Sequence, residues 1–586
     1  MRQWMVAAKK ADFYAIAEKF HVDPVVARII RNREVIGEKN IRIYLGGNLS
    51  DLSDPHQMKD MDRLVEILAK KIRKQVRIRI IGDYDVDGVT SSHLFLMALR
   101  RVGAKVDVVI PHRIQDGYGL SLHLLQQAKE DGVDTILTCD NGIAAIDEIA
   151  WAKAQKMTVL VTDHHAVPFE EHEGRRTEKK SLADAVVNPH QQDCGYPYKE
   201  LCGAGVAWNV IRVLYENYDM DKREAEDLLD FVAMATVCDV MSLTGENRIL
   251  VKEGLKRIRH TKNIGLQALM QACNVQPENI SAYHFGYVLG PCVNATGRLD
   301  TARHALRLFE TGQETEAEEI ARDLVDLNQE RKELTLQGVE MAKKLCEEGG
   351  YENDPVLVLF LPDVHESIAG LIAGRIREMY NRPVFVLTRG EEGVKGSGRS
   401  TENYSMYENM CGCAELFTKF GGHPMAAGLS LPEENVEKFR RKINENCPLT
   451  VEEVCPDIHI DMAMPVGYAS TELVHQFALL EPFGKDNPSP LFADRNLSIS
   501  RMWVIGKNRN VLRMSVLSEY GQPVPVIFFG DVETLFAYFT EKFGQKEVEN
   551  ALHGRKNRIL FSMVYTAKID FYQGNENLQL EMKYYR

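Results

Sequence analysis

The chain has 586 residues, 45% of them hydrophobic, which is enough for three or four packed domains of ~150 residues each. Its formal net charge of −13 excludes a basic field over the whole molecule, so any nucleic-acid contact must use local basic patches. The 11 cysteines include no Cys-x-x-Cys pair, and no stretch approaches ~20 apolar residues. We therefore expect a soluble, cytoplasmic protein with reduced thiols and no membrane contact.

The first 55 residues favour helices and end in the turn-rich run Asp51–Pro55. From there to about residue 240, short apolar runs alternate with helical patterns. This alternation is typical of βαβ units and predicts a mostly parallel sheet. The expected strands are Val76–Ile81, Val106–Ile110, Thr135–Thr138, Thr158–Thr162 and Ala185–Val187.

Residues 301–348 contain no proline and are rich in helix-forming residues, which predicts long helices that end at Gly349-Gly350. A second α/β unit follows, with strands Val356–Phe360 and Val384–Leu387 and a helix over Ser367–Tyr380. From about residue 456, short strands with turn signals predict a small β-barrel. Its expected strands are Leu497–Ile505, Val511–Val516, Val524–Phe529, Arg558–Tyr565 and Leu578–Tyr584.

The fold class is therefore α/β, with a parallel-sheet domain joined by long helices to a second, smaller α/β domain, plus a C-terminal β-barrel. The expected segments are an N-terminal segment, a main domain, a helical connector, a second domain and a barrel. They span residues 1–55, 56–300, 301–350, 351–450 and 456–586.

Acidic residues follow several of the predicted strands. Asp83 and Asp85 follow Ile81 in the run Gly82–Gly88, Asp140 follows Thr138, and Asp163-His164-His165 follows Thr162. Because the carboxyl ends of parallel strands share one rim of a sheet, these side chains should lie together. Mg²⁺ and Mn²⁺ prefer oxygen ligands, and Mn²⁺ also accepts imidazole. The pattern predicts a metal site, with Asp239 as a further ligand.

Other readings exist for the single motifs. A calcium loop that starts at Asp83 places Gly88 correctly but has Leu94 where a glutamate is required, which argues against calcium. Asp140 or Asp239 taken alone is as often a turn or helix cap. Adjacent histidines are usually surface residues. Only the whole cluster favours metal-assisted phosphoester hydrolysis, in which two ions ~3.5–4 Å apart clamp a phosphate and activate water.

Four motifs resemble, in order, those of the DHH phosphoesterase superfamily. They are Asp83-Tyr84-Asp85-Val86-Asp87, Thr138-Cys139-Asp140-Asn141, Thr162-Asp163-His164-His165 and Val237-Cys238-Asp239. Further signatures between about residues 76 and 492 are similar to those of the RecJ family of single-strand-specific exonucleases. They include Asn294-Ala295-Thr296-Gly297-Arg298, Gly396-Ser397-Gly398-Arg399 and Gly421-Gly422-His423.

The resemblance implies two bound ions, Mn²⁺ or Mg²⁺. The ligands of one ion would be Asp85, Asp140, His164 and Asp239, and those of the other Asp83, Asp140 and Asp239. His165 would help to hold the scissile phosphate, with Asp163 as the second catalytic residue. Some relatives have a ligand histidine four positions before the first Asp. This chain has Arg79 there, which implies a second ion that keeps more water.

The resemblance also implies a pocket for the 5′ end of a strand, since arginine matches phosphate well. Its residues would be Arg113, Arg298, Ser397 and Arg399, with the loop Gly421, Gly422 and His423 nearby. The barrel resembles an OB-fold, which binds single strands by stacking and charge. Its candidate contacts are Arg501, Trp503, Lys507, Arg509 and Arg513, and a solvated face with a core tryptophan is an equal alternative.

By this resemblance the protein is a single-stranded-DNA-specific 5′→3′ exonuclease that releases 5′-mononucleotides in recombination and repair. It would act as a monomer on single-stranded DNA, with single-strand-binding protein and a helicase as candidate partners. One alternative is an oligonucleotide or cyclic-dinucleotide phosphodiesterase of the same superfamily. Another is a non-catalytic replication scaffold like Cdc45.

Overall fold

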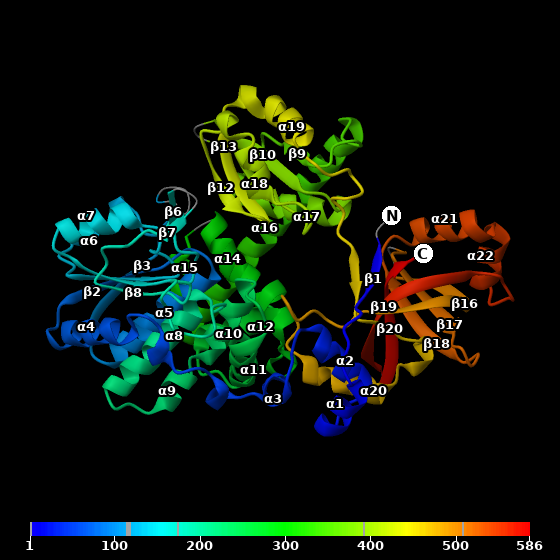
Figure 1. The fold of residues 1–586 in the computed structure, drawn as a ribbon, viewed down its shortest axis with the longest axis horizontal. Helices are drawn as coiled ribbons and strands as arrows, with labels where there is room; N and C mark the ends of the chain where they lie inside the picture. The colour runs from blue at the N-terminus through cyan, green and yellow to red at the C-terminus, as the bar shows by residue number, and fades with distance from the viewer. Residues whose placement is uncertain are drawn as a thin grey trace. The chain divides into compact units, whose positions relative to one another are not determined.

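The structure is a computed structural model that describes residues 3–112, 116, 119–172, 175–299, 301–390, 393–506, 509–572 and 574–586. The chain forms two compact units (Figure 1). The first contains Leu52–Met241 and Glu246–Pro456. The second contains Gln3–Asp51, Ser242–Gly245 and Asp457–Arg586. No helix in the described part of the chain is long and apolar enough to cross a membrane.

The first unit begins with a five-stranded, fully parallel sheet in the order β3-β2-β4-β5-β8. Its middle strands are buried on both faces, which explains their continuous apolar sequence. Helices α6 and α7 cover one face, and α4, α5 and α8 cover the other (Figure 1). The strands are β2 (Arg77–Ile81), β3 (Lys105–Val109), β4 (Thr135–Cys139), β5 (Thr158–Thr162) and β8 (Ala185–Val187). The helices are α4 (Met61–Arg73), α5 (Val86–Arg101), α6 (Leu122–Glu130), α7 (Ile146–Ala154) and α8 (Gly203–Asn217).

A helical layer follows the sheet and leads to the second domain of this unit. As predicted, a long helix, α16 (Glu314–Glu348), precedes Gly349 and Gly350, and the latter adopts a φ of 66° that favours glycine. Both α12 and α14 pack against α16, and so does α17 of the second domain. The other helices of this layer are α10 (Leu229–Cys238), α11 (Gly245–Ile258), α12 (Ile264–Ala272), α14 (Gly290–Leu299) and α15 (Arg303–Glu310).

The second domain has a five-stranded sheet in the order β12-β13-β11-β10-β9, in which only the β9–β10 pair is parallel. Helix α17 (Ala369–Tyr380) packs on one face of this sheet, and α18 (Met406–Cys411) and α19 (Val436–Glu445) pack on the other. The strands are β9 (Leu357–Phe360), β10 (Val384–Gly390), β11 (Gly393–Arg399), β12 (Lys419–His423) and β13 (Ala426–Leu431).

The second unit contains a six-stranded sheet in the order β15-β16-β17-β18-β20-β19. Pairing between β16 and β19 closes five of these strands into a barrel, and β15 pairs with β16 beside the closed ring. The strands of the sheet are β15 (Met462–Ala463), β16 (Phe492–Ile505), β17 (Val511–Leu517), β18 (Pro523–Phe529), β19 (Leu560–Tyr572) and β20 (Asn575–Tyr585). The α/β class with a terminal barrel is therefore confirmed. Two helices between β18 and β19 were not predicted from the sequence. They are α21 (Val532–Phe543) and α22 (Gln545–Leu552).

The N-terminal segment belongs to the barrel unit. Strand β1 (Trp4–Val6) pairs with β14 (Ile458–Ile460), and helix α2 (Pro24–Asn32) contributes to the barrel's apolar core. Arg33 makes an ion pair of 2.7 Å with Asp461. Residues more than 400 positions apart therefore share one core, which no local sequence pattern indicates.

Candidate metal centre and nucleic-acid contacts

Carboxylates and two histidines meet at the carboxyl ends of β2, β4 and β5. His164 Nε2 lies 3.0 Å from Asp140 Oδ1 and 3.6 Å from an oxygen of Asp239, which stands at the end of α10. Ligand atoms of Asp83, Asp85 and Asp140 lie within 4.8 Å of one another, as do those of Asp140, His164 and His165. The structure thus brings together all six residues of the predicted metal cluster.

Asp87 joins the same cluster, although the sequence analysis assigned it no role. Its two carboxylate oxygens accept hydrogen bonds from the backbone of Gly203 and Ala204, at 2.5 and 2.8 Å, at the start of α8. One of these oxygens lies 3.6 Å from His164 Nε2. The signal was available in the motif itself, because Asp87 is the third carboxylate of the Asp-x-Asp-x-Asp run. Its place at a helix N-terminus offsets part of its charge.

The carboxylates of this rim need a compensating cation. Burial, followed by repulsion from neighbouring carboxylates, raises the pKa of Asp83, Asp85 and Asp140. Asp83 is 1% exposed, and its buried Oδ1 has no hydrogen-bond partner within the described part of the chain. Buried carboxylates are normally paired or bound to metal. The oxygen-rich set with one or two imidazoles fits Mn²⁺ or Mg²⁺.

Asp163 accepts hydrogen bonds from the backbone of its own loop and of the segment after β4. Its Oδ1 accepts hydrogen bonds from the amides of His164 and His165 at 2.7 and 3.0 Å, and its Oδ2 accepts one from Ile143 at 2.9 Å. His165 Nδ1 lies 2.8 Å from Asp163 Oδ1. These contacts make Asp163 a positioning residue for the two histidines, and a direct catalytic role for it remains a prediction.

Asp163 and His165 form a pair in which the aspartate is negative and the histidine is positive. Burial lowers the pKa of His165, but the hydrogen bond and charge of Asp163 outweigh it and raise that pKa to about 9. For Asp163 burial acts in the opposite direction and raises the pKa, but the hydrogen bond from His165 outweighs it, so the pKa of Asp163 is lowered overall. His165 is therefore a cation at neutral pH, which suits the predicted contact with a phosphate.

Arg79 points away from this site. Its guanidinium donates to both oxygens of Asp107 at 2.8 and 3.0 Å and to Asp131 at 2.8 Å. The hydrogen bond with Asp107 outweighs burial and raises the pKa of Arg79. The guanidinium of Arg79 thus binds β2 to β3 and takes no part in the acidic cluster.

Three of the residues predicted for the 5′ end lie around the start of α17. Arg298 Nη1 donates to the carbonyl of Ser367 at 2.7 Å. A Cβ atom at Gly370 would lie 2.9 Å from Arg399 Nη2 and 3.4 Å from Ser397 Cβ. The fourth residue, Arg113, lies outside the described residues.

The predicted glycine loop forms the end of β12. Gly421 and Gly422 pair with β13, and Gly422 has a φ of 152°. A Cβ atom at Gly422 would lie 2.5 Å from the carbonyl oxygen of Ala426, so only glycine fits this hairpin. His423 is exposed beside it.

Helix α14 also reaches the acidic loop. Asn294 Oδ1 accepts a hydrogen bond from the amide of Val86 at 3.2 Å. A Cβ atom at Gly297 would lie 2.4 Å from the carbonyl oxygen of Tyr84. The motif that contains both residues therefore packs directly against the loop that carries Asp83 and Asp85.

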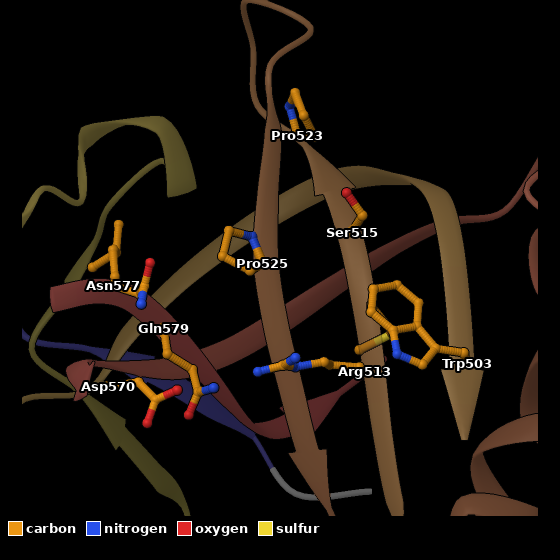
Figure 2. A pocket seen from close by; sticks show the side chains of 10 residues that line it. Trp503, Arg513, Ser515, Pro523, Pro525, Asp570, Asn577 and Gln579 are labelled. Atoms are coloured by element: carbon orange, nitrogen blue, oxygen red, sulfur yellow. The ribbon is translucent and has the colours of Figure 1, made fainter. Parts of the chain in front are cut away.

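The barrel carries a cavity of about 520 Å³ on the outer side of β16–β18 (Figure 2). Trp503 and Arg513 are paired across β16 and β17, and Arg501 lies 5.7 Å from the Trp503 ring. Trp503 is 37% exposed, so it is a surface residue and not part of the core. The cavity is lined by Trp503, Arg513, Met514, Ser515, Pro523, Pro525, Asp570, Asn577, Leu578 and Gln579. Of the other predicted contacts, Arg509 has a φ of 51°, and Lys507 lies outside the described residues.

Three family models match the chain in order. The model of the DHH family, N-terminal domain, matches residues 77–236, the DHHA1 domain matches 353–447, and the RecJ OB domain matches 460–584. The first match contains Asp83, Asp85, Asp140, His164 and His165, and ends just before Asp239.

Curated proteins named single-stranded-DNA-specific exonuclease RecJ are similar over most of the chain. The protein of Haemophilus influenzae is 32% identical over 96% of this chain and 96% of its own length. The Escherichia coli protein is 32% identical over 95% of each chain. The Bacillus subtilis protein is also 32% identical, but the match spans 63% of its length.

Solved structures agree with these similarities. RecJ of Thermus thermophilus in complex with Mn²⁺ is 25% identical, with a TM-score of 0.81 over 100% of this chain and 79% of that chain. A structure of exonuclease RecJ bound to manganese is 32% identical, with a TM-score of 0.56 over 66% of this chain and 94% of that chain.

Proposed function

The chain belongs to the RecJ family of single-stranded-DNA-specific exonucleases, and from this premise we propose that it degrades single-stranded DNA from the 5′ end to 5′-mononucleotides. The family resemblance noted in the sequence is thereby confirmed. The observation that carries the activity is the cluster of Asp83, Asp85, Asp140, His164 and Asp239 at one rim of the parallel sheet.

The protein's own residues divide the work of hydrolysis. Two divalent ions would be held by Asp83, Asp85, Asp140, His164 and Asp239. Asp87 lies beside His164 and would help to hold the imidazole of this ligand in place. When bound, these ions supply the Lewis acidity that activates water and stabilises the leaving oxygen.

His165 adds a positive charge beside the ligands. Its Nδ1 is occupied by Asp163, and the imidazolium lies 4.0 Å from Asp140. The imidazolium would contact the scissile phosphate through its charge, and Asp163 keeps the ring oriented.

The direction of degradation is part of the proposal. Arg298, Ser397 and Arg399 lie around the start of α17, where they would bind the 5′-phosphate of a strand. We assign Arg113, Gly421, Gly422 and His423 to the same pocket on the basis of their motifs. We propose that duplex DNA is excluded sterically, by a passage to the ions that is too narrow for two strands.

Both alternatives have weaker support. A phosphodiesterase for dinucleotides has no need of the barrel, whose sequence matches the RecJ OB domain. A scaffold that has lost catalysis has no need of buried, mutually repelling carboxylates. Comparison of rates on a dinucleotide and on a long strand would distinguish the first alternative, and binding without hydrolysis in Mn²⁺ would support the second.

The cellular setting is proposed on chemical grounds. All 11 cysteines are free thiols, which fits the reducing cytoplasm. Single-stranded DNA is the substrate. A helicase would produce it by unwinding a duplex, and single-strand-binding protein would present it. We propose that the monomer is active.

A digestion assay tests the function and the site together. We expect a 5′-phosphorylated strand to lose label from its 5′ end in Mn²⁺ or Mg²⁺, and a duplex to resist. Asp140→Ala should reduce the rate by about 10³-fold or more, because it removes a ligand common to both ions. Asp147→Ala, on the exposed side of α7, is the matched control and should retain wild-type activity. Full activity in Asp140→Ala would contradict the site, and release of label from the 3′ end would contradict the direction.

A further inference from the structure

Two exposed tyrosines stack on each other in the turn that leads into α14. Tyr283 and Tyr287 are 62% and 71% exposed. Their ring centroids are 5.2 Å apart, and the planes differ by 24°. An exposed pair of stacked aromatic rings offers a flat apolar face on which the face of another ring can stack.

The local backbone is built to present these rings. Tyr287 lies in a π-helical turn, Phe285–Leu289, which continues α13 (Ala282–His284) into α14. Such turns are rare and frequently occur at functional sites. Phe285 and Leu289 are buried and hold the inner side of the turn, so the outer side is free for Tyr287.

This turn is joined to the helix that carries a metal ligand. The thiol of Cys238 donates to the carbonyl of Phe285 at 3.3 Å. A Cβ atom at Gly290 would lie 2.3 Å from the same sulfur. Because Asp239 follows Cys238 directly, the tyrosines and this ligand belong to one packed pair of helices.

The same continuous helix then passes the acidic loop and reaches the proposed 5′ pocket. Asn294 binds the amide of Val86, and Arg298 binds Ser367. At about 1.5 Å per residue, Tyr287 lies about 10 Å before Asn294 and about 16 Å before Arg298. Along the helix, the tyrosine pair therefore comes first. The residue that contacts the acidic loop of Asp83 and Asp85, here called the metal loop, comes next, and the proposed 5′ pocket comes last.

We propose that Tyr283 and Tyr287 stack on unpaired bases of the substrate strand on the 3′ side of the bond that is cut. The inference rests on the proposed 5′→3′ activity, which places the 5′ end at Arg298 and the remaining strand on the opposite side of the metal loop. At about 3.4 Å per stacked nucleotide, about 10 Å corresponds to roughly three nucleotides. The pair thus contacts bases about three nucleotides beyond the metal loop.

The chemistry of the pair suits this substrate and adds to its selectivity. Every base has a face that can stack on an aromatic ring, so the contact tolerates any sequence. In a duplex these faces are covered by neighbouring bases, and a flat pair of rings on a helix surface cannot reach them. The platform therefore favours single strands independently of the width of any passage.

The first test compares substrates of two lengths. For Tyr283→Ala/Tyr287→Ala, we expect the ratio of KM on a 20-nucleotide strand to KM on a 5′-phosphorylated dinucleotide to rise about tenfold. Tyr283→Phe/Tyr287→Phe keeps the rings and should restore the wild-type ratio. Tyr14→Ala removes an equally exposed tyrosine from the other unit and is the control. An equal loss on both substrates, or no change in the ratio, would overturn the proposal.

A binding measurement separates this inference from the proposed activity. Single abasic nucleotides are placed at successive positions of a fluorescent strand, and affinity is measured without divalent ions. We expect the wild type to lose affinity over a short window about three to five nucleotides from the 5′ end, and the double alanine variant to lose no more there. If the double alanine variant still loses affinity at the same abasic positions, the stacking contact is contradicted, whatever the hydrolysis assay shows.

Discussion

Single residues of the metal centre differ in what their surroundings allow them to do. Burial and mutual repulsion raise the pKa of Asp83, Asp85 and Asp140, and a bound cation would offset this cost of ionisation. Asp163 instead receives three backbone hydrogen bonds and the His165 ring. These four aspartates at one rim therefore have at least two different functions, and only their partners distinguish them.

One buried histidine outside this centre couples folding to pH. His93 of α5 packs between Phe231 and Phe309, and burial, aided by the charge of Arg100, lowers its pKa to about 3. An unfolded histidine takes up a proton below about pH 6.5, whereas the folded one stays neutral. The unfolded state thus binds more protons below pH 6.5, and stability falls as the pH drops from there towards 3.

We expect His93→Phe to remove this contribution. Between pH 7 and 5 the variant should lose about 2 kcal/mol less of its free energy of unfolding than the wild type, as denaturant titrations at both pH values would measure. An unchanged slope in His93→Phe would show that His93 is not the titrating group.

At the scale of elements, helix starts bring backbone close to the carboxylates. Helix α5 begins at the acidic loop, where Asp85 caps it through the amide of Gly88 at 3.0 Å. Helix α8 begins at Gly203, whose amide donates to Asp87. The positive ends of two helices therefore face one cluster of negative charge.

Gly203 is required by this close approach. A Cβ atom there would lie 2.6 Å from Asp140 Cβ and 2.9 Å from Asp87 Oδ2. We expect Gly203→Ala to lower kcat by about 100-fold or more, because it displaces both carboxylates. Gly205→Ala, two residues further along α8, meets Leu201 at 3.4 Å and should change kcat by less than about threefold. Equal activity of the two variants would refute the role of this contact.

At the scale of the molecule, the chain is divided into a unit that contains the ligands and a unit that contains the barrel. The N-terminal segment crosses this division, since β1 and α2 join the barrel unit and the chain then enters the unit with the ligands. Each unit has its own apolar core, so the two can respond differently to a ligand.

Calorimetry should reveal that independence. We expect two unfolding transitions, of which Mn²⁺ raises only one, by about 2.7 kcal/mol at 100 times its Kd. Asp140→Ala should abolish the shift, whereas Asp147→Ala should keep it. A shift of both transitions together would show that the units unfold as one.

The sequence by itself determined the fold class and predicted most residues of the candidate metal centre. Strands Thr158–Thr162 and Ala185–Val187 were predicted with their observed bounds, because a strand buried on both faces reads as a continuous apolar run. The clustering of the predicted ligand residues after β2, β4 and β5 followed from the sequence, because parallel strands end at one rim and residues after different strands must meet there.

Only the tertiary structure decided the rest. The contacts of Asp87 with α8, the pairing of Arg79 with Asp107 and the exposure of the tyrosine pair depend on neighbours that are distant in sequence. The union of the N-terminal helices with the barrel spans more than 400 residues. Local patterns report the periodicity of an element, whereas burial and partners arise when elements pack, and this packing gives the individual aspartates their separate functions.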